Sequence, residues 1–285
     1  MVPPVAAGPI NETEILARHG YTIGAEMGEG TYSKVKHCTW SKPGESPAEK
    51  KKIAIKIINK KTAPKDFLEK FLPRELEILR KVHHPNVVQT FEIITINHKV
   101  FIALEWAGKG DLLAFVRLRG SLKESDCRRI FTEMCNGIKY LHENEIVHRD
   151  LKCENILICS NNTIKIADFG FARSLKPTDL SKTFCGSAAY AAPELLQGTP
   201  YIGTKADIWS MGVILYIMIC SSMPFRDSNI KTLLSDQRAP LHIPSSILPN
   251  LTKELKDLLL HILSFDHNRR ITMEQIFKSK WMNKK

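Results

Sequence analysis

His148-Arg149-Asp150-Leu151-Lys152-Cys153-Glu154-Asn155 is the stretch that decides the fold of this 285-residue chain. It sets an aspartate, a lysine and an asparagine in one short segment after a helical pattern at Glu124–Glu143. Transfer of a phosphoryl group to a hydroxyl needs a carboxylate that orients the acceptor, a cation near the phosphoryl group, and a metal ligand. Asp150, Lys152 and Asn155 offer these groups in that order.

Two triplets follow at set distances. Asp168-Phe169-Gly170 begins 13 residues after Asn155 and ends a strand expected at Thr163–Ala167. Its carboxylate is an oxygen ligand of the kind that Mg²⁺ prefers. Ala192-Pro193-Glu194 closes a 27-residue segment that starts at Asp168. Each triplet is common by chance, but their order and spacing together favour a phosphotransfer site over a purely structural loop.

A glycine-rich turn lies near the start of the chain. Gly28-Glu29-Gly30-Thr31-Tyr32-Ser33-Lys34-Val35 follows an expected strand at Tyr21–Met27. Glycines allow backbone N–H groups to approach phosphates closely. Two closely spaced glycines are also typical of an ordinary hairpin, so the turn alone leaves both interpretations open.

The expected strand Lys52–Ile58 carries a lysine among aliphatic residues. Strand alternation puts Ala54 and Lys56 on one face, where a small residue leaves room for a purine and the ammonium can reach phosphates. Glu75, on a helical pattern at Phe67–Val82, is the candidate partner of Lys56. The alternative is an edge-strand lysine that points to water.

The secondary-structure pattern changes character along the chain. Strand-like runs precede Asp111, and helical periodicity dominates after it, with Thr204–Cys220 and Lys253–Leu263 among the clearest helices. We therefore expect a flexible lead at 1–20, with a short helix at Glu12–Arg18, and one domain at 21–282. Within that domain we place a small lobe at 21–104, a hinge at 105–110 and a larger lobe at 111–282.

Composition argues against several other classes of protein. Most of the surplus behind the net charge of +11 lies between Lys34 and Lys81, where we count 14 basic and six acidic residues. These lysines lack interleaved stacking aromatics, so we expect a solvated face and no nucleic-acid partner. The longest apolar stretch, Gly212–Cys220, is too short to span a membrane and is expected to be a buried helix.

The seven cysteines have no metal-ligand spacing, and Met1–Ile10 lacks the basic and then apolar pattern of a signal peptide. We therefore expect free thiols and a cytoplasmic protein.

With these motifs, the sequence resembles the eukaryotic protein kinases from Tyr21 to Trp281. The resemblance implies an α+β, bilobal fold. A small antiparallel β-rich N-lobe of five strands with one main helix precedes a larger, mainly helical C-lobe, and ATP binds between them. A serine/threonine kinase that uses ATP and Mg²⁺ and acts on protein substrates is the implied activity.

The same resemblance assigns roles to individual residues. Lys56, Glu75, Asp150 and Lys152 are implied in catalysis, and Asn155 and Asp168 in metal binding. The implied nucleotide-binding positions are Met27, Gly28, Gly30, Val35, Ala54, Lys56, Glu105, Ala107, Asp111 and Leu157.

Finer segments, Lys65–Glu75 and Leu180–Ser187, resemble the testis-specific serine kinases of the calcium/calmodulin-dependent group. That family implies a short kinase of male germ cells that acts on Arg-x-x-Ser/Thr sites. Asp111 and Glu154 match positions that face substrate residues two to three before the acceptor, so we expect arginine there. The alternatives are that both acids are merely solvated or that Asp111 serves the ribose.

Regulation is also implied. Thr183 lies 15 residues after Asp168, which is the spacing of activating phosphothreonines in the kinases that this chain resembles. Arg149 and Arg173 are the candidate cations for its phosphate, and an upstream kinase is a possible partner. The alternative is an enzyme that is active without modification.

Two other functions remain open from the sequence: a catalytically silent kinase fold that acts as a scaffold, and a small-molecule phosphotransferase. The complete set of Lys56, Asp150, Asn155 and Asp168 disfavours the first. The second is disfavoured by the Ala192-Pro193-Glu194 segment and the loop 183–187, which the resemblance implies in peptide docking. We expect a monomer.

Overall fold

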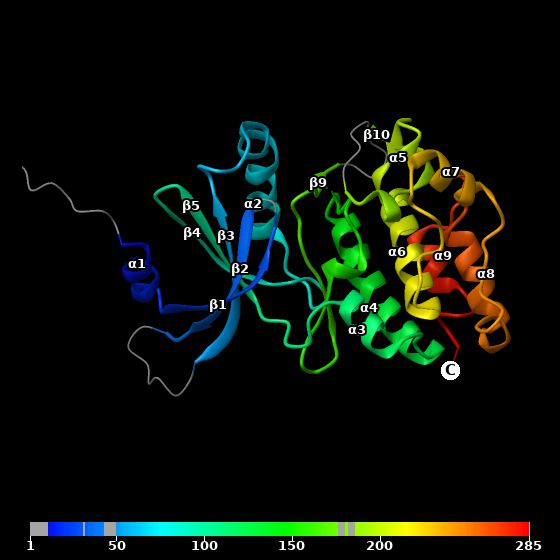
Figure 1. Cartoon of the computed structure of the whole chain (residues 1–285), viewed down its shortest axis with the longest axis horizontal. Coiled ribbons are helices and arrows are strands. Elements are labelled where there is room, and N and C mark those ends of the chain that lie inside the picture. The colour runs from blue at the N-terminus through cyan, green and yellow to red at the C-terminus, as the bar shows by residue number, and fades with distance from the viewer. Residues whose placement is uncertain (1–10, 31, 43–49, 176–179, 182–185, 285) are drawn as a thin grey trace, which may run out of the picture. The chain divides into compact units, whose positions relative to one another are not determined.

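The computed structural model describes residues 11–30, 32–42, 50–175, 180–181 and 186–284. The chain divides into two compact units, and Figure 1 shows the elements of each. The first unit comprises the described residues up to Leu76 together with 89–106, and the second comprises 77–88 together with the described residues from Ala107 onward. The predicted α+β architecture, with a β-rich part and a larger helical part, is confirmed.

The first unit is built on one antiparallel sheet of five strands in the order β1-β2-β3-β5-β4. Register pairs Lys56 of β3 with Val35 of β2 and with Ile102 of β5, so the lysine lies on a central strand. The elements that contribute residues to this unit are α1 (Glu12–Arg18), β1 (Tyr21–Glu29), β2 (Ser33–Trp40), β3 (Lys51–Asn59), α2 (Leu72–Lys81), β4 (Thr90–Ile96) and β5 (Lys99–Glu105).

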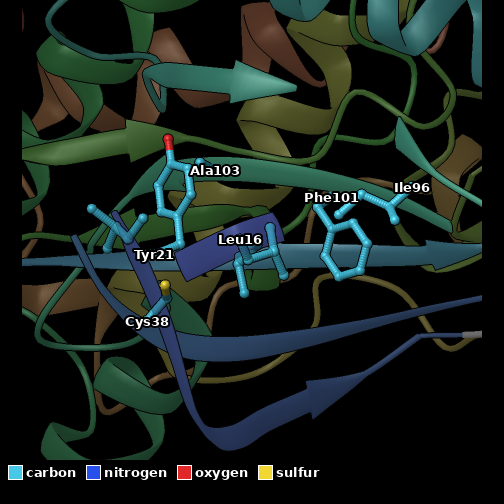
Figure 2. Close-up of a cluster of buried hydrophobic side chains, with 8 residues drawn as sticks. Leu16, Tyr21, Cys38, Ile96, Phe101 and Ala103 are labelled. Carbon is cyan, nitrogen blue, oxygen red and sulfur yellow. The ribbon is translucent and has the colours of Figure 1, made fainter. Parts of the chain in front are cut away.

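Helix α1 packs on this sheet. Asn11 caps its first turn by accepting a hydrogen bond from the backbone N–H of Thr13. Leu16 is only 1% exposed and belongs to a buried cluster with Tyr21, Cys38 and Phe101, which Figure 2 shows beside the strands. Residues 11–20 therefore differ from the flexible lead expected for 1–20, because the apolar face of α1 is buried on the sheet.

The segment before Glu75 is less regular than the expected helix at Phe67–Val82. A π-helical turn at Phe67–Phe71 precedes α2, and Pro73 is the second residue of α2. Proline fits that position because the N–H groups of a helix's first turn need no intrahelical acceptor.

The expected small lobe, 21–104, is one continuous stretch, whereas the first unit of the structure is not. Residues 77–88 pack with the second unit, where the N–H of Val88 donates to the carbonyl of Ile166 (2.9 Å). The N–H of His83 donates to the hydroxyl of Tyr140 (3.0 Å). The end of α2 therefore belongs to the unit that carries the catalytic motif.

The second unit is mainly helical, with short two-stranded sheets. Its further elements are α3 (Leu112–Arg119), α4 (Glu124–Glu143), β6 (Ile146–Val147), β7 (Ile156–Ile158), β8 (Ile164–Ile166), β9 (Arg173–Ser174), β10 (Leu180–Ser181), α5 (Pro193–Leu196), β11 (Tyr201–Ile202), α6 (Gly203–Cys220), α7 (Ile230–Arg238), α8 (Lys253–Ile262) and α9 (Met273–Lys278).

Helix α6 forms the core of this unit. It is apolar almost all round and buried along its length, including Trp209 and Met218. In the described part of the chain it is the one helix long and apolar enough to span a membrane, but 83% of that window is buried inside the unit, as in a core helix. The six described cysteines are free and buried.

Candidate active site

Within the first unit, Lys56 and Glu75 form an ion pair. The Nζ of Lys56 lies 2.6 Å from Oε1 of Glu75, and the carboxylate is almost completely buried. Alternation along β3 puts Lys56 on the same face as Ala54, which is also buried. The alternative interpretation, in which Lys56 is an edge-strand lysine that points to water, does not fit the contact with Glu75.

The glycine-rich turn joins β1 to β2. Gly28 pairs with Val35 across the two strands, and the N–H of Gly30 donates to the carbonyl of Ser33 (2.7 Å). Met27 is 48% exposed on β1. Strand pairing therefore continues to the base of the turn, which is a hairpin built from the residues expected to approach phosphates.

In the second unit, a buried aspartate of α6 fixes the backbone of the catalytic segment. The carboxylate of Asp207 accepts the N–H of His148 and the N–H of Arg149, both at 2.9 Å, and lies 2.8 Å from Nε2 of His142. Burial by itself raises the pKa of Asp207, but the hydrogen bond from His142 and nearby positive charges outweigh it and hold the pKa below its ordinary value. Asp207 therefore remains an acceptor for the segment that precedes Asp150.

The carboxylate of Asp150 is a hub for three side chains. Lys152 places Nζ 2.8 Å from Oδ2, and Ser187 donates its N–H (3.0 Å) and hydroxyl (3.2 Å) to Oδ1. Asn155 donates Nδ2 to the carbonyl of Asp150 (2.9 Å) and to Oδ2 (3.3 Å). This is the environment expected of a carboxylate that orients an acceptor hydroxyl, with a lysine beside it.

Two oxygen donors follow Asp150. Because Nδ2 of Asn155 is directed to Asp150, its Oδ1 is left as the donor for a cation. Asp168 has a left-handed backbone (φ 64°), and its Oδ1 accepts the N–H of Gly170 (3.3 Å). Among the described residues there is no cluster of three or more His, Cys, Asp or Glu side chains that would hold a metal by itself. A hard cation held by two protein oxygens and substrate phosphates fits this donor set.

The remaining nucleotide-binding candidates lie in both units. Glu105 ends β5 in the first unit, and its N–H donates to the carbonyl of Gln89 (2.9 Å). In the second unit, Asp111 caps α3 by accepting the N–H of Ala114 (2.8 Å), and it bridges to Leu157 of β7. Ala107 is the first residue of the longer of the two stretches that make up the second unit. The cap occupies one oxygen of Asp111 and leaves the other for a ligand.

Gly186 is a site residue that the sequence reasoning did not single out. Its φ is 90°, and a Cβ there would lie 2.6 Å from the carbonyl oxygen of Arg149 and 3.0 Å from Oδ1 of Asp150. Only glycine allows this close approach, which brings the N–H of Ser187 to Asp150. A glycine directly before Ser187 is the sequence feature that indicates such a close backbone approach.

Strand pairing places Arg173 opposite the strand that leads into Arg149. β6 pairs with β9, so Arg173 is the register partner of Val147, two residues before Arg149. The Nε of Arg149 donates to the carbonyl of Phe171 (2.8 Å), whereas its buried Nη1 has no hydrogen-bond partner in the described part of the chain. Thr183 lies outside the described residues.

A second buried ion pair holds the Ala192-Pro193-Glu194 motif. Arg270 donates Nη1 and Nη2 to the two oxygens of Glu194, at 2.6 and 2.9 Å. A bidentate arginine–carboxylate pair of this kind is a strong, geometrically specific contact. It anchors the segment that follows Ser187.

Tyr190, another residue not singled out, lies in this segment. Its hydroxyl donates to Oε2 of Glu154 at 3.3 Å. The two residues are 36 positions apart, and no local pattern in the sequence links them.

Comparison with known proteins agrees with this geometry. The family described as the protein kinase domain matches residues 21–282. Testis-specific serine/threonine-protein kinase 1 of Mus musculus is 48% identical over 283 residues, which cover 97% of this chain and 75% of that protein. Testis-specific serine/threonine-protein kinase 3 of Mus musculus is 41% identical over 272 residues, which cover 94% of this chain and 98% of that protein.

Proposed function

Because this chain belongs to the protein kinase family and is a serine/threonine kinase, we propose that it transfers the γ-phosphoryl group of ATP, with Mg²⁺, to protein hydroxyls through Asp150. The observation that carries the proposal is the set of contacts around Asp150. Lys152, Asn155 and Ser187 all donate hydrogen bonds to its carboxylate, which favours one orientation of that group.

In this proposal the Asp150 carboxylate accepts the proton of the substrate hydroxyl as that oxygen attacks the phosphoryl group. Lys152 contributes a positive charge next to the developing negative charge. Ser187, which contacts both side chains, holds the substrate-facing segment in register with them. The backbone hydrogen bonds to Asp207 keep this arrangement rigid before substrate binds.

We assign the phosphates of ATP to Lys56 and to the backbone N–H groups of the glycine-rich turn. The ion pair with Glu75 supports this assignment, because it holds the ammonium in one place on a central strand. Ala54, Glu105 and Ala107 are the proposed neighbours of the adenine. Mg²⁺, held by Asn155 and Asp168, supplies charge neutralisation of the phosphates when bound.

The proposed substrates are proteins with arginine two to three residues before the acceptor. Glu154 is exposed and has no basic partner among the described residues, which leaves a carboxylate for a substrate guanidinium. The names of the relatives support a role in male germ cells. We also propose a cytoplasmic monomer that an upstream kinase activates at Thr183.

The test is transfer of labelled phosphate from ATP to a basic protein by the purified chain, compared with Asp150→Asn. Loss of a positioned base lowers the rate of transfer by about 10²–10⁴-fold. Affinity for ATP should change much less. Asp227→Asn, at an exposed aspartate of the same unit, is the matched control and should leave the rate unchanged. A wild-type chain that binds ATP without transferring phosphate would instead support the scaffold function.

A further inference from the structure

The phenol of Tyr190 is buried, and its hydroxyl is hydrogen-bonded to a side chain at the surface. The residue is 7% exposed, and its hydroxyl donates to Oε2 of Glu154 at 3.3 Å. Glu154 itself is exposed. The hydroxyl of a buried ring therefore contacts an exposed carboxylate of the catalytic segment.

Tyr190 is held in place by its own backbone. Its N–H donates to the carbonyl of Ser187 (3.0 Å), and its carbonyl accepts the hydroxyl of Ser210 on α6 (2.9 Å). Burial, with the nearby Cys153 and Glu154, raises the pKa of Tyr190 well above its ordinary value. The hydroxyl therefore keeps its proton and acts as a donor to Glu154 at physiological pH.

The backbone of Glu154 is fixed as well, whereas its side chain makes no second hydrogen bond to any residue that the structure describes. Its neighbours Cys153 and Asn155 are both buried, and the three residues form one 3₁₀ turn. In the described part of the chain no lysine or arginine forms an ion pair with Glu154. The contact with Tyr190 is the hydrogen bond that selects the orientation of the carboxylate.

We propose that Tyr190 is a positioning residue for substrate specificity, which orients Glu154 to receive the arginine that precedes the acceptor. This inference rests on the proposed arginine preference. The Tyr190 hydroxyl occupies Oε2, while Oε1 and the remaining lone pairs of Oε2 stay available to a guanidinium. Because the carboxylate is oriented before substrate binds, less side-chain entropy is lost on binding.

The experiment measures kcat and KM on two peptides that differ only before the acceptor, one with arginine and one with alanine at both the second and third positions. The ratio of their kcat/KM values reports the arginine preference. Tyr190→Phe keeps the buried ring and removes the hydroxyl. Loss of one hydrogen bond to the carboxylate should lower the ratio about three- to ten-fold, through KM for the arginine peptide. kcat on the alanine peptide should not change.

Two further variants make the test specific. Glu154→Gln should reduce the arginine preference most, and adding Tyr190→Phe to it should cause no further loss, because the two side chains act together. Tyr216→Phe is the matched control, since Tyr216 is also buried and its hydroxyl donates to the carbonyl of His242 (2.8 Å) in the same unit. It should leave the ratio unchanged.

Each other outcome overturns a different statement. A wild-type enzyme with equal activity on both peptides would contradict the proposed arginine preference, and the role of Tyr190 with it. A preference that is lost in Glu154→Gln but kept in Tyr190→Phe would contradict only the positioning role. An equal loss of kcat on both peptides in Tyr190→Phe would show a general structural role instead.

Discussion

The Nζ of Lys56 lies 2.6 Å from Oε1 of Glu75, and the Glu75 side chain is 2% exposed. Removing one partner of a buried ion pair is strongly destabilising, because the other charge is left without its contact. The pair therefore links the proposed phosphate contact to the stability of the first unit, and the two effects can be separated by mutation.

Lys56→Met should abolish phosphoryl transfer, because the ammonium that contacts the phosphates is lost. It should also lower the free energy of unfolding by up to about 3–5 kcal/mol, since Glu75 is left buried without its partner. Turnover and urea denaturation measured on the same preparation check both effects.

The double variant Lys56→Met/Glu75→Gln is the control for that prediction. It should recover most of the stability while transfer stays lost. Lys52→Met, on the exposed part of the same strand, should change neither quantity. Full activity of Lys56→Met would remove Lys56 from the nucleotide site.

Much of the fold follows from sequence pattern. The helix expected at Glu124–Glu143 is observed with the same bounds, because its apolar residues recur at helical spacing and form the buried face of α4. The helix at Glu12–Arg18 is also observed as expected, and Asn11 provides its N-cap. Its burial on the sheet could not be predicted, since that depends on contacts between Leu16 and strands far along the chain.

The candidate site shows the same limit. The spacing of the motifs in the sequence was enough to predict Asp150, Asn155 and Asp168, because these residues lie close together along the chain. The Tyr190–Glu154 contact joins residues 36 positions apart and depends on how the segment after Gly186 folds back on Asp150. Long-range hydrogen bonds of this kind leave no periodicity in a single sequence.

Helix α1 should contribute to the stability of the first unit although it lies outside the matched residues 21–282. Leu16→Ala leaves a cavity in the cluster of Figure 2 and should cost about 2–5 kcal/mol in the free energy of unfolding. Leu118→Ala is the matched control, because Leu118 is 86% exposed on α3, and it should cost almost nothing. Equal losses in urea denaturation would contradict the packing of α1.

Asp207 should make stability depend on pH in the acid range. Its folded-state pKa is held below the ordinary value of 3.8, so its ionised form contributes stability above that pH, and this contribution is lost as the pH falls through the folded-state pKa. Asp207→Asn should therefore be less stable than wild type at pH 5, and the difference should narrow toward pH 3. The measurement is the urea midpoint at each pH. A difference that stays constant to pH 3 would contradict the lowered pKa.

Phosphorylation of Thr183 should switch the enzyme on through Arg149. The buried Nη1 of Arg149 has no hydrogen-bond partner in the described part of the chain, and the β6–β9 pairing sets Arg173 opposite Val147, two residues before Arg149. A phosphate carries about −1.5 to −2 charges and three acceptor oxygens, enough to pair with both guanidinium groups. The segment that contains Thr183 leads into Gly186 and Ser187, which contact Asp150, so a fixed phosphate would also fix the substrate-facing contacts.

The measurement compares the rate of peptide phosphorylation by the phosphorylated enzyme, the phosphatase-treated enzyme and Thr183→Ala, with the state of Thr183 read by mass spectrometry. Only the first should be fast. Arg173→Gln should lower the rate of the phosphorylated enzyme and leave the slow rate of Thr183→Ala unchanged, because no acidic side chain in the described part of the chain pairs with its guanidinium and the phosphate is its expected anion. Phosphorylation at Ser187 should have the opposite effect, since a phosphate there would face the carboxylate of Asp150 at hydrogen-bond distance. Three equal rates would show that the enzyme is active without modification.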